Sequence, residues 1–170
     1  MNIAVTGYSG SGKTAVSRLL AQKLDKKLIS TEEEIIKKTR LSVDKIVKKF
    51  GWDKLREIEA EVIDNISELD EYVLDASCGI IFRNENIVNL KKNGSIVLLT
   101  ASQSTIESRL KRKEEKPDFT KDNYINKTKG ALSECEERYR KAADYIIDTS
   151  DMTPEEACDL IVHYIQMEIR

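Results

Sequence analysis

The sequence predicts an α/β fold in which a five-stranded parallel sheet carries helices on both of its faces. Short apolar runs alternate with stretches of helical periodicity along the chain, and strands joined by helices pack in three layers through right-handed crossovers. Residues 95–100 read SIVLLT, and their lack of polar alternation is typical of a strand buried on both faces. With 170 residues the chain has the length of one compact domain, predicted to span residues 1–170.

The predicted elements follow one another without a repeat, a linker or a low-complexity segment. Strands are expected at residues 2–6, 27–29, 71–75, 95–100 and 145–148. Helices are expected at residues 15–25, 30–38, 42–50, 52–69, 82–92, 104–113 and 124–143, and from residue 153 onward. Residues 112–119 interrupt the helical periodicity with charges and a proline, which predicts a mobile loop.

Local cues support several helix starts. Ser30 lies three residues before a glutamate, and so does Thr31, which predicts two overlapping capping boxes at one helix start. Pro154 follows Thr153 and suits the first turn of the last helix. Phe50 and Trp52 follow helical apolar spacing, which favours packing in the core over a contact with a substrate ring.

Residues 7–14 read GYSGSGKT and fit the P-loop pattern G-x-x-x-x-G-K-[ST] between an apolar strand and a helix. Glycines in the loop let the backbone curl so that successive N–H groups and the helix dipole face a phosphate. Lys13 is predicted to reach the β- and γ-phosphates of ATP, and the Thr14 hydroxyl to bind Mg²⁺. The fold is therefore predicted to be that of a P-loop NTPase, and the predicted nucleotide contacts here are Gly10, Ser11, Gly12, Lys13, Thr14 and Ala15.

Composition excludes several other classes of protein. The chain has 28 basic and 30 acidic residues, and a net charge of -2 gives no broad attraction to nucleic acid or to an anionic membrane. Its three cysteines are widely spaced without a C-x-x-C pair, so neither a disulfide framework nor a zinc site is indicated. With no apolar run near 18 residues, we expect a cytoplasmic monomer whose partner is a small-molecule acceptor.

Five patches in this order resemble the shikimate kinase family of small P-loop metabolite kinases, and the likeness extends over the whole chain. Beyond the P-loop, the patches are residues 28–35 (LISTEEEI), 55–62 (LREIEAEV), 109–117 (RLKRKEEKP) and 138–150 (RYRKAADYIIDTS). The resemblance implies phosphorylation of a hydroxyl group on a small metabolite by ATP and Mg²⁺, with shikimate as the first acceptor to consider. It also implies a mobile lid at about residues 113–121.

The resemblance implies roles for further residues around the nucleotide. Arg112 and Thr149 are expected to contact ATP. A basic cluster around the lid is expected to neutralise charge on the transferring phosphoryl group, and its members are Arg109, Arg112, Lys113 and Lys116. Glu32 is a candidate base or orienting group for the acceptor hydroxyl, although an acid in the first turn of a helix is also an ordinary dipole partner. Asp75, at the end of an apolar strand, either holds a Mg²⁺-bound water or caps the turn that follows.

The acceptor half departs from the family pattern. The family's second strand ends in Asp-x-Asp, whereas Ser30 and Glu32 occupy those positions here. The substrate arginine of the family falls on Arg56, which either holds an anionic group of the acceptor with Glu59 as its ion-pair partner or pairs with Glu59 on a solvated helix face.

The remaining acceptor positions also differ. The glycine triplet after the third strand reads Ser77-Cys78-Gly79 here, with Gly79 retained for close approach of the substrate. The second carboxylate-binding arginine falls on Cys135, and Arg138, three residues along the same helix, is the candidate replacement. These changes leave two alternatives open: a kinase of another acceptor, such as a nucleotide or a sugar acid, and a regulatory protein that binds nucleotide without turnover.

Overall fold

The computed structural model describes residues 1–112 and 129–168, and its centre is a five-stranded sheet of order β2-β3-β1-β4-β5. Every pair of neighbouring strands is parallel. The strands are β1 (Asn2–Gly7), β2 (Lys27–Ser30), β3 (Tyr72–Asp75), β4 (Gly94–Thr100) and β5 (Tyr145–Asp148). The predicted fold class is confirmed.

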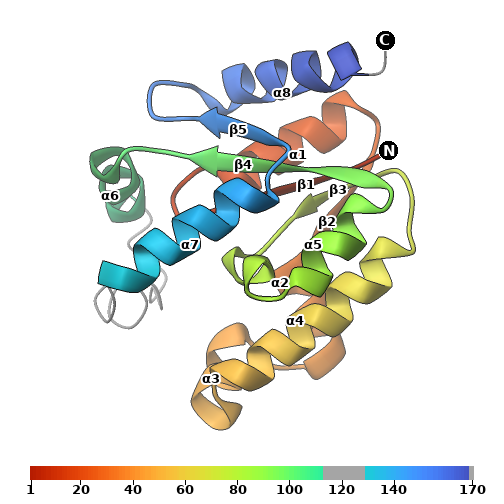
Figure 1. Cartoon of the computed structure of the whole chain (residues 1–170), viewed down its shortest axis with the longest axis vertical. Helices are drawn as coiled ribbons and strands as arrows, with labels where there is room; N and C mark the ends of the chain where they lie inside the picture. Colours follow the sequence, from red (N-terminus) through yellow and green to blue (C-terminus); the bar gives the residue numbers. More distant parts are fainter. Residues whose placement is uncertain (113–128, 169–170) are drawn as a thin grey trace.

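Helices cover both faces of the sheet. Figure 1 shows α1 and α8 on one face and α4, α5 and α7 on the other. The helices are α1 (Lys13–Lys23), α2 (Thr31–Thr39), α3 (Val43–Phe50), α4 (Trp52–Ser67), the 3₁₀ helix η1 (Cys78–Phe82), α5 (Asn84–Lys91), α6 (Gln103–Lys111), α7 (Lys129–Ala142) and α8 (Pro154–Glu168). In the described part of the chain no helix is long and apolar enough to cross a bilayer.

Alternating side chains of β1, β3 and β4 belong to two separate hydrophobic clusters, one on each face of the sheet. Val97 and Leu99 belong to the cluster beneath α1 and α8, whereas Ile96 and Leu98 belong to the cluster on the opposite face. All four are at most 1% exposed. Burial on both faces is the physical reason that β4 reads as a continuous apolar run.

The strand ends are aligned so that three loops meet at one edge of the sheet. Ser30 at the end of β2 is paired in register with Asp75 at the end of β3. On its other side, Asp75 is paired with Val5 of β1. The P-loop follows β1, α2 follows β2 and the turn into η1 follows β3. The carboxyl edge of a parallel sheet is where α/β proteins place their ligands, so this register predicts where the site lies.

The predicted start of the last helix at Pro154 is confirmed, and one of the two caps predicted for α2 is present. Thr153 Oγ1 accepts a hydrogen bond from the backbone N–H of Glu156 at 3.2 Å, and Glu156 accepts one from the N–H of Thr153 at 2.8 Å. At α2, Ser30 Oγ accepts from Glu33 N–H at 3.4 Å. Thr31 does not cap, because its hydroxyl donates to the Asp75 carbonyl at 3.3 Å and ties α2 to the end of β3.

The prediction that Phe50 and Trp52 pack in the core is wrong. Phe50 is 52% exposed and Trp52 is 37% exposed. Gly51 ends α3 and begins α4 with a φ of 87°, so the two aromatic residues lie on different helices at a corner of the chain. Apolar spacing within each helix does not fix the orientation of residues at such a junction.

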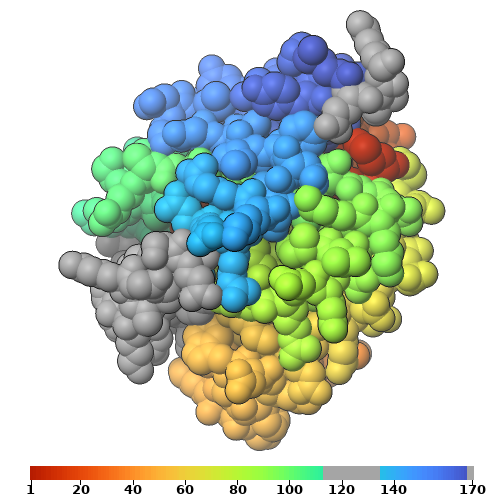
Figure 2. Space-filling model, viewed as in Figure 1, coloured from red at the N-terminus to blue at the C-terminus, as the bar shows by residue number. Residues whose placement is uncertain are grey.

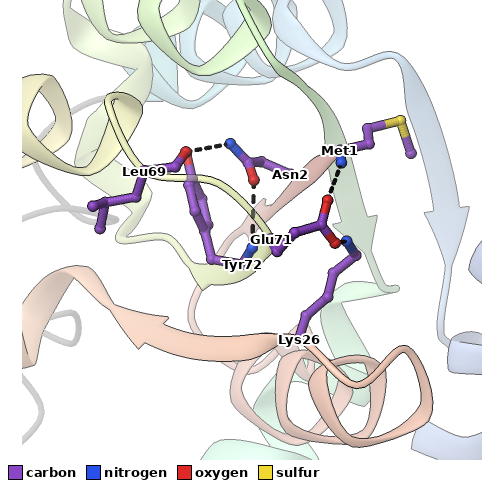
Figure 3. A network of polar contacts seen from close by, with 6 residues as sticks. All are labelled: Met1, Asn2, Lys26, Leu69, Glu71 and Tyr72. Atoms are coloured by element: carbon purple, nitrogen blue, oxygen red, sulfur yellow. Dashed lines mark hydrogen bonds and ion pairs between the residues drawn. The ribbon is translucent and has the colours of Figure 1, made fainter.

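A polar network at the opposite end of the sheet holds the starts of β1 and β3 together (Figure 3). The Asn2 side chain donates to the Leu69 carbonyl at 2.9 Å and accepts from the backbone N–H of Tyr72 at 3.3 Å. Glu71 accepts hydrogen bonds from Lys26 Nζ and from the Met1 amino group. These two cations, Lys26 foremost, lower the pKa of Glu71 from 4.5 to about 2.

We expect Glu71→Gln to lower stability at neutral pH but not at pH 2. The carboxylate has its ordinary pKa of 4.5 in the unfolded chain and a pKa of about 2 in the folded one. The contribution of the Glu71 ion pairs to the free energy of unfolding is therefore complete above pH 4.5 and is lost as the pH falls toward 2. The effect is small because Glu71 is exposed. Urea unfolding from pH 7 to 2 measures it, with Glu68→Gln as the control for loss of one charge, and an effect that persists at pH 2 contradicts the ion-pair explanation.

Candidate active site

The P-loop forms the tight turn that its glycines predict. Gly12 lies at the N-terminal cap of α1 with a φ of 99°, a conformation that residues with a Cβ rarely adopt. The turn is closed by a hydrogen bond from Ser11 N–H to the Tyr8 carbonyl at 3.1 Å. Lys13 Nζ lies over the loop and donates to the carbonyls of Gly7 at 2.9 Å and Tyr8 at 3.1 Å. A strand, a glycine loop and a helix therefore present backbone amides and one ammonium to a common point.

A cavity of about 750 Å³ lies over this loop, between α6 and the start of α8. That volume suits a nucleotide-sized ligand. Every residue that the sequence predicted as a nucleotide contact lines it: Gly10, Ser11, Gly12, Lys13, Thr14, Ala15, Arg112 and Thr149. Glu32 does not line this cavity and lies exposed in the first turn of α2. Lys116 and the predicted lid lie outside the described residues.

Arg109 joins the walls of the cavity, a role that sequence reasoning did not assign. Its guanidinium donates to the Gly10 carbonyl at 3.2 Å, to Thr149 Oγ1 at 3.0 Å and to the Thr149 carbonyl at 2.6 Å. The buried Thr149 hydroxyl lies 2.9 Å from the Ser11 carbonyl. Arg109 and Thr149 thus tie the P-loop to the loop after β5, and only the basic cluster at the end of α6 hinted at this in the sequence.

Thr14 and Asp75, the two predicted metal ligands, are in contact. Thr14 Oγ1 donates to Asp75 Oδ2 at 2.7 Å. Among the described residues there is no cluster of three or more His, Cys, Asp or Glu that could hold a metal ion by itself. A hydroxyl and one carboxylate beside a phosphate loop fit Mg²⁺, because this ion usually takes one or two protein oxygens together with substrate phosphates.

On the acceptor side, Arg56 and Glu59 form the expected ion pair on α4. Arg56 Nη1 lies 2.5 Å from Glu59 Oε2, and the two side chains are only 13% and 3% exposed. Gly79 lies against this pair, because a Cβ at that position would be 1.6 Å from Arg56 Nη1. The guanidinium carbon also lies 4.6 Å from the ring centroid of Phe82 and 5.4 Å from that of Trp52. Arg56 is therefore fixed by an acid, two aromatic rings and the lack of a side chain at Gly79.

The α7 side of the acceptor half is apolar where the family pattern has a cation. Cys135 is 5% exposed and lies in the core cluster with Tyr139, whereas Arg138 is exposed. Figure 2 shows α7 lying across this face of the molecule between α6 and α5. Tyr139 donates to the Cys78 carbonyl at 2.8 Å, and its ring meets that of Tyr8 edge-on at 5.1 Å. Burial, and then the nearby Cys135, raises the pKa of Tyr8 to about 12.

The fold and this arrangement of residues define a P-loop kinase that transfers phosphate to a small molecule. The shikimate kinase family model matches residues 9–166, and the chain belongs to that family. Shikimate kinases from Caldicellulosiruptor bescii and Thermodesulfovibrio yellowstonii are 36% and 37% identical to it over 161 residues, which cover 95% of this chain and 93% and 92% of theirs. The chain is accordingly an ATP-dependent kinase of a small-metabolite hydroxyl group.

A solved structure agrees with this assignment. Shikimate kinase from Acinetobacter baumannii, in complex with shikimate, superposes with a TM-score of 0.83 at 28% identity. The match covers 99% of this chain and 92% of that one. The predicted family membership is confirmed by both kinds of comparison.

We expect Lys13→Ala to abolish most turnover while the fold survives. Loss of the ammonium removes a charge-assisted contact to the β- and γ-phosphates, which should lower kcat/KM for ATP by at least about a hundredfold. A coupled assay of ADP release measures turnover, and calorimetry measures ADP affinity. Lys23→Ala, on the same helix but paired with Asp159 away from the loop, is the control. Unchanged ADP affinity in folded Lys13→Ala would contradict the phosphate role.

Proposed function

We propose that shikimate is the acceptor and that Arg56 holds its carboxylate. The observation that carries this proposal is the fixed Arg56 guanidinium, paired with buried Glu59 and lying against Gly79 in the turn after β3. A guanidinium fork suits a carboxylate, and its ordering before binding lowers the entropy cost of the contact. The resemblance to relatives that bear the name shikimate kinase supports the same acceptor.

The proposed metal ligands are Thr14 directly and Asp75 through a bound water. Their contact at 2.7 Å at the edge of the P-loop supports this role, and the two oxygens are of the type that Mg²⁺ prefers. When bound, Mg²⁺ would neutralise charge on the β- and γ-phosphates. Ser30, at the position where the family pattern has an acid, caps α2 instead.

The proposed reaction depends on positioning and electrostatics without a covalent intermediate. The P-loop amides and Lys13 hold the transferring phosphate, and Arg112 at the end of α6 lines the same cavity and balances the charge that develops there. We assign Lys116 to the same task. Glu32, in the first turn of α2 next to the end of β3, orients the acceptor hydroxyl and takes up its proton.

Buried Cys135 favours a second candidate function, the phosphorylation of a different acid. An acceptor whose anionic group needs a single arginine would suit this site better than one that needs two. A nucleotide and a sugar acid are the alternatives to test, and a protein that binds ATP without any turnover is the alternative from another class.

We expect shikimate to be accepted with a high KM and Arg56→Ala to raise that KM further. Loss of a charge-assisted bidentate contact costs roughly 1.5 to 3 kcal/mol, or about one to two decades in affinity. Arg138→Ala should raise it less, because Arg138 is exposed on α7. An ADP-release assay over a panel of shikimate, nucleotides and sugar acids provides the measurement. A faster reaction with another acid selects the second candidate, and no turnover with any acceptor contradicts both kinase proposals.

We expect Asp75→Asn to raise the Mg²⁺ concentration for half-maximal activity, by about tenfold for one lost carboxylate contact. Ser30→Ala should leave that concentration unchanged and lower stability by about 1 kcal/mol, because Ser30 caps α2. Magnesium titrations and thermal unfolding of both variants separate these effects. Equal and mild effects on the magnesium requirement would assign Asp75 to the turn alone.

A further inference from the structure

A buried polar network behind Arg56 includes a side chain that the family pattern does not have. Glu59 Oε2 is occupied by Arg56, and Glu59 Oε1 accepts a hydrogen bond from Ser77 Oγ at 2.8 Å. Because Glu59 is 3% exposed, each of its oxygens needs a donor from the protein. Ser77 supplies the second donor, at a position where the family pattern has glycine.

The backbone of Ser77 is tied to the metal side of the site. Its N–H donates to Thr31 Oγ1 at 3.4 Å, and the Thr31 hydroxyl donates to the Asp75 carbonyl at 3.3 Å. Thr31 is fully buried, and Asp75 in turn contacts Thr14. The turn from Asp75 to Ser77 is thereby attached to α2 through its backbone and to α4 through the Ser77 side chain.

This attachment constrains the direction of the Arg56 guanidinium. The rings of Phe82 and Trp52 lie over the guanidinium. Gly79 makes room for Nη1, because a Cβ at that position would collide with it. Glu59 is an anionic contact that orients the guanidinium within this space. Without the hydrogen bond from Ser77, one buried oxygen of Glu59 would have no donor. The Glu59 side chain would then rotate toward another donor, and the Arg56 guanidinium would move with it.

We propose that Ser77 is a positioning residue for the acceptor, which acts through Glu59 on Arg56. The inference rests on the proposed role of Arg56 in holding the acceptor's anionic group. Ser77 does not contact the acceptor in this scheme. Its hydroxyl sets the direction of the arginine, and its backbone keeps that arginine in register with the strand end that carries Asp75.

We expect Ser77→Ala to raise the KM for shikimate by about tenfold, the equivalent of one hydrogen bond to a charged group, with the KM for ATP unchanged. If the acceptor panel selects another acid, that acid replaces shikimate in the assay. Ser77→Thr keeps the hydroxyl at a φ of -59° and a ψ of 154°, angles that a β-branched residue adopts, and should leave the KM unchanged. Ser67→Ala is the matched control, because Ser67 is a buried serine at the far end of α4 whose hydroxyl donates to the Asp64 carbonyl at 2.7 Å. It should lower thermal stability without any change in the acceptor KM.

A double-mutant cycle of Ser77→Ala with Arg56→Lys separates the positioning role of Ser77 from the binding role of Arg56. Lysine keeps the charge beside Glu59 but lacks the planar fork, so the KM should rise and Ser77→Ala should add little to it. Full additivity of the two changes would overturn the positioning role, and so would an unchanged KM in Ser77→Ala while Arg56→Lys has its effect. In both cases the proposed function stands. An unchanged KM in Arg56→Lys would overturn the role of Arg56 and the inference with it.

Discussion

The parallel register of β1, β2 and β3 is the constraint on which the site depends. Asp75 is paired with Val5 on one side and with Ser30 on the other, so the P-loop, the start of α2 and the turn into η1 leave the sheet at one level. A shift by one residue would turn Asp75 away from Thr14 and move the alternating side chains of β3 to the wrong hydrophobic cluster. The two-faced core therefore fixes the site as well as the fold.

The buried Arg56–Glu59 pair illustrates an interaction that serves position more than stability. Removing charges from water costs much of what their attraction returns, and such a pair adds little net stability compared with apolar residues of the same shape. Breaking it by removing one partner costs about 3–5 kcal/mol, because the other charge remains buried. Any orientation of the guanidinium that breaks the ion pair therefore costs free energy. Ser77, Phe82 and Gly79 restrict the orientations of the guanidinium further.

The sequence predicted what depends on neighbouring residues and missed much of what depends on tertiary contacts. The P-loop is contiguous, so its residues and their place after β1 could be assigned from spacing alone. Asp75 could be placed beside the P-loop because an acid ends an apolar strand, and it does contact Thr14. Thr31 was expected to cap its own helix, yet its hydroxyl bonds a strand 44 residues away. Arg109 contacts Gly10 across 99 residues of sequence, and no local pattern signals that distance.

The site departs from the family pattern at Ser30 and at Cys135. Where the family pattern has an acid at the end of the second strand, this chain has Ser30, and the register partner of Ser30 on the neighbouring strand is Asp75. Paired strands lie about 4.8 Å apart, so Asp75 places a carboxylate at the same edge of the sheet while Ser30 caps α2. On the acceptor side, Cys135 occupies the arginine position within an apolar cluster, and Arg138 lies on the exposed side of α7. In the proposed function the electrostatic selection of an acidic acceptor therefore depends mainly on Arg56, so the residues that fix its direction matter more than they would in a site with two arginines.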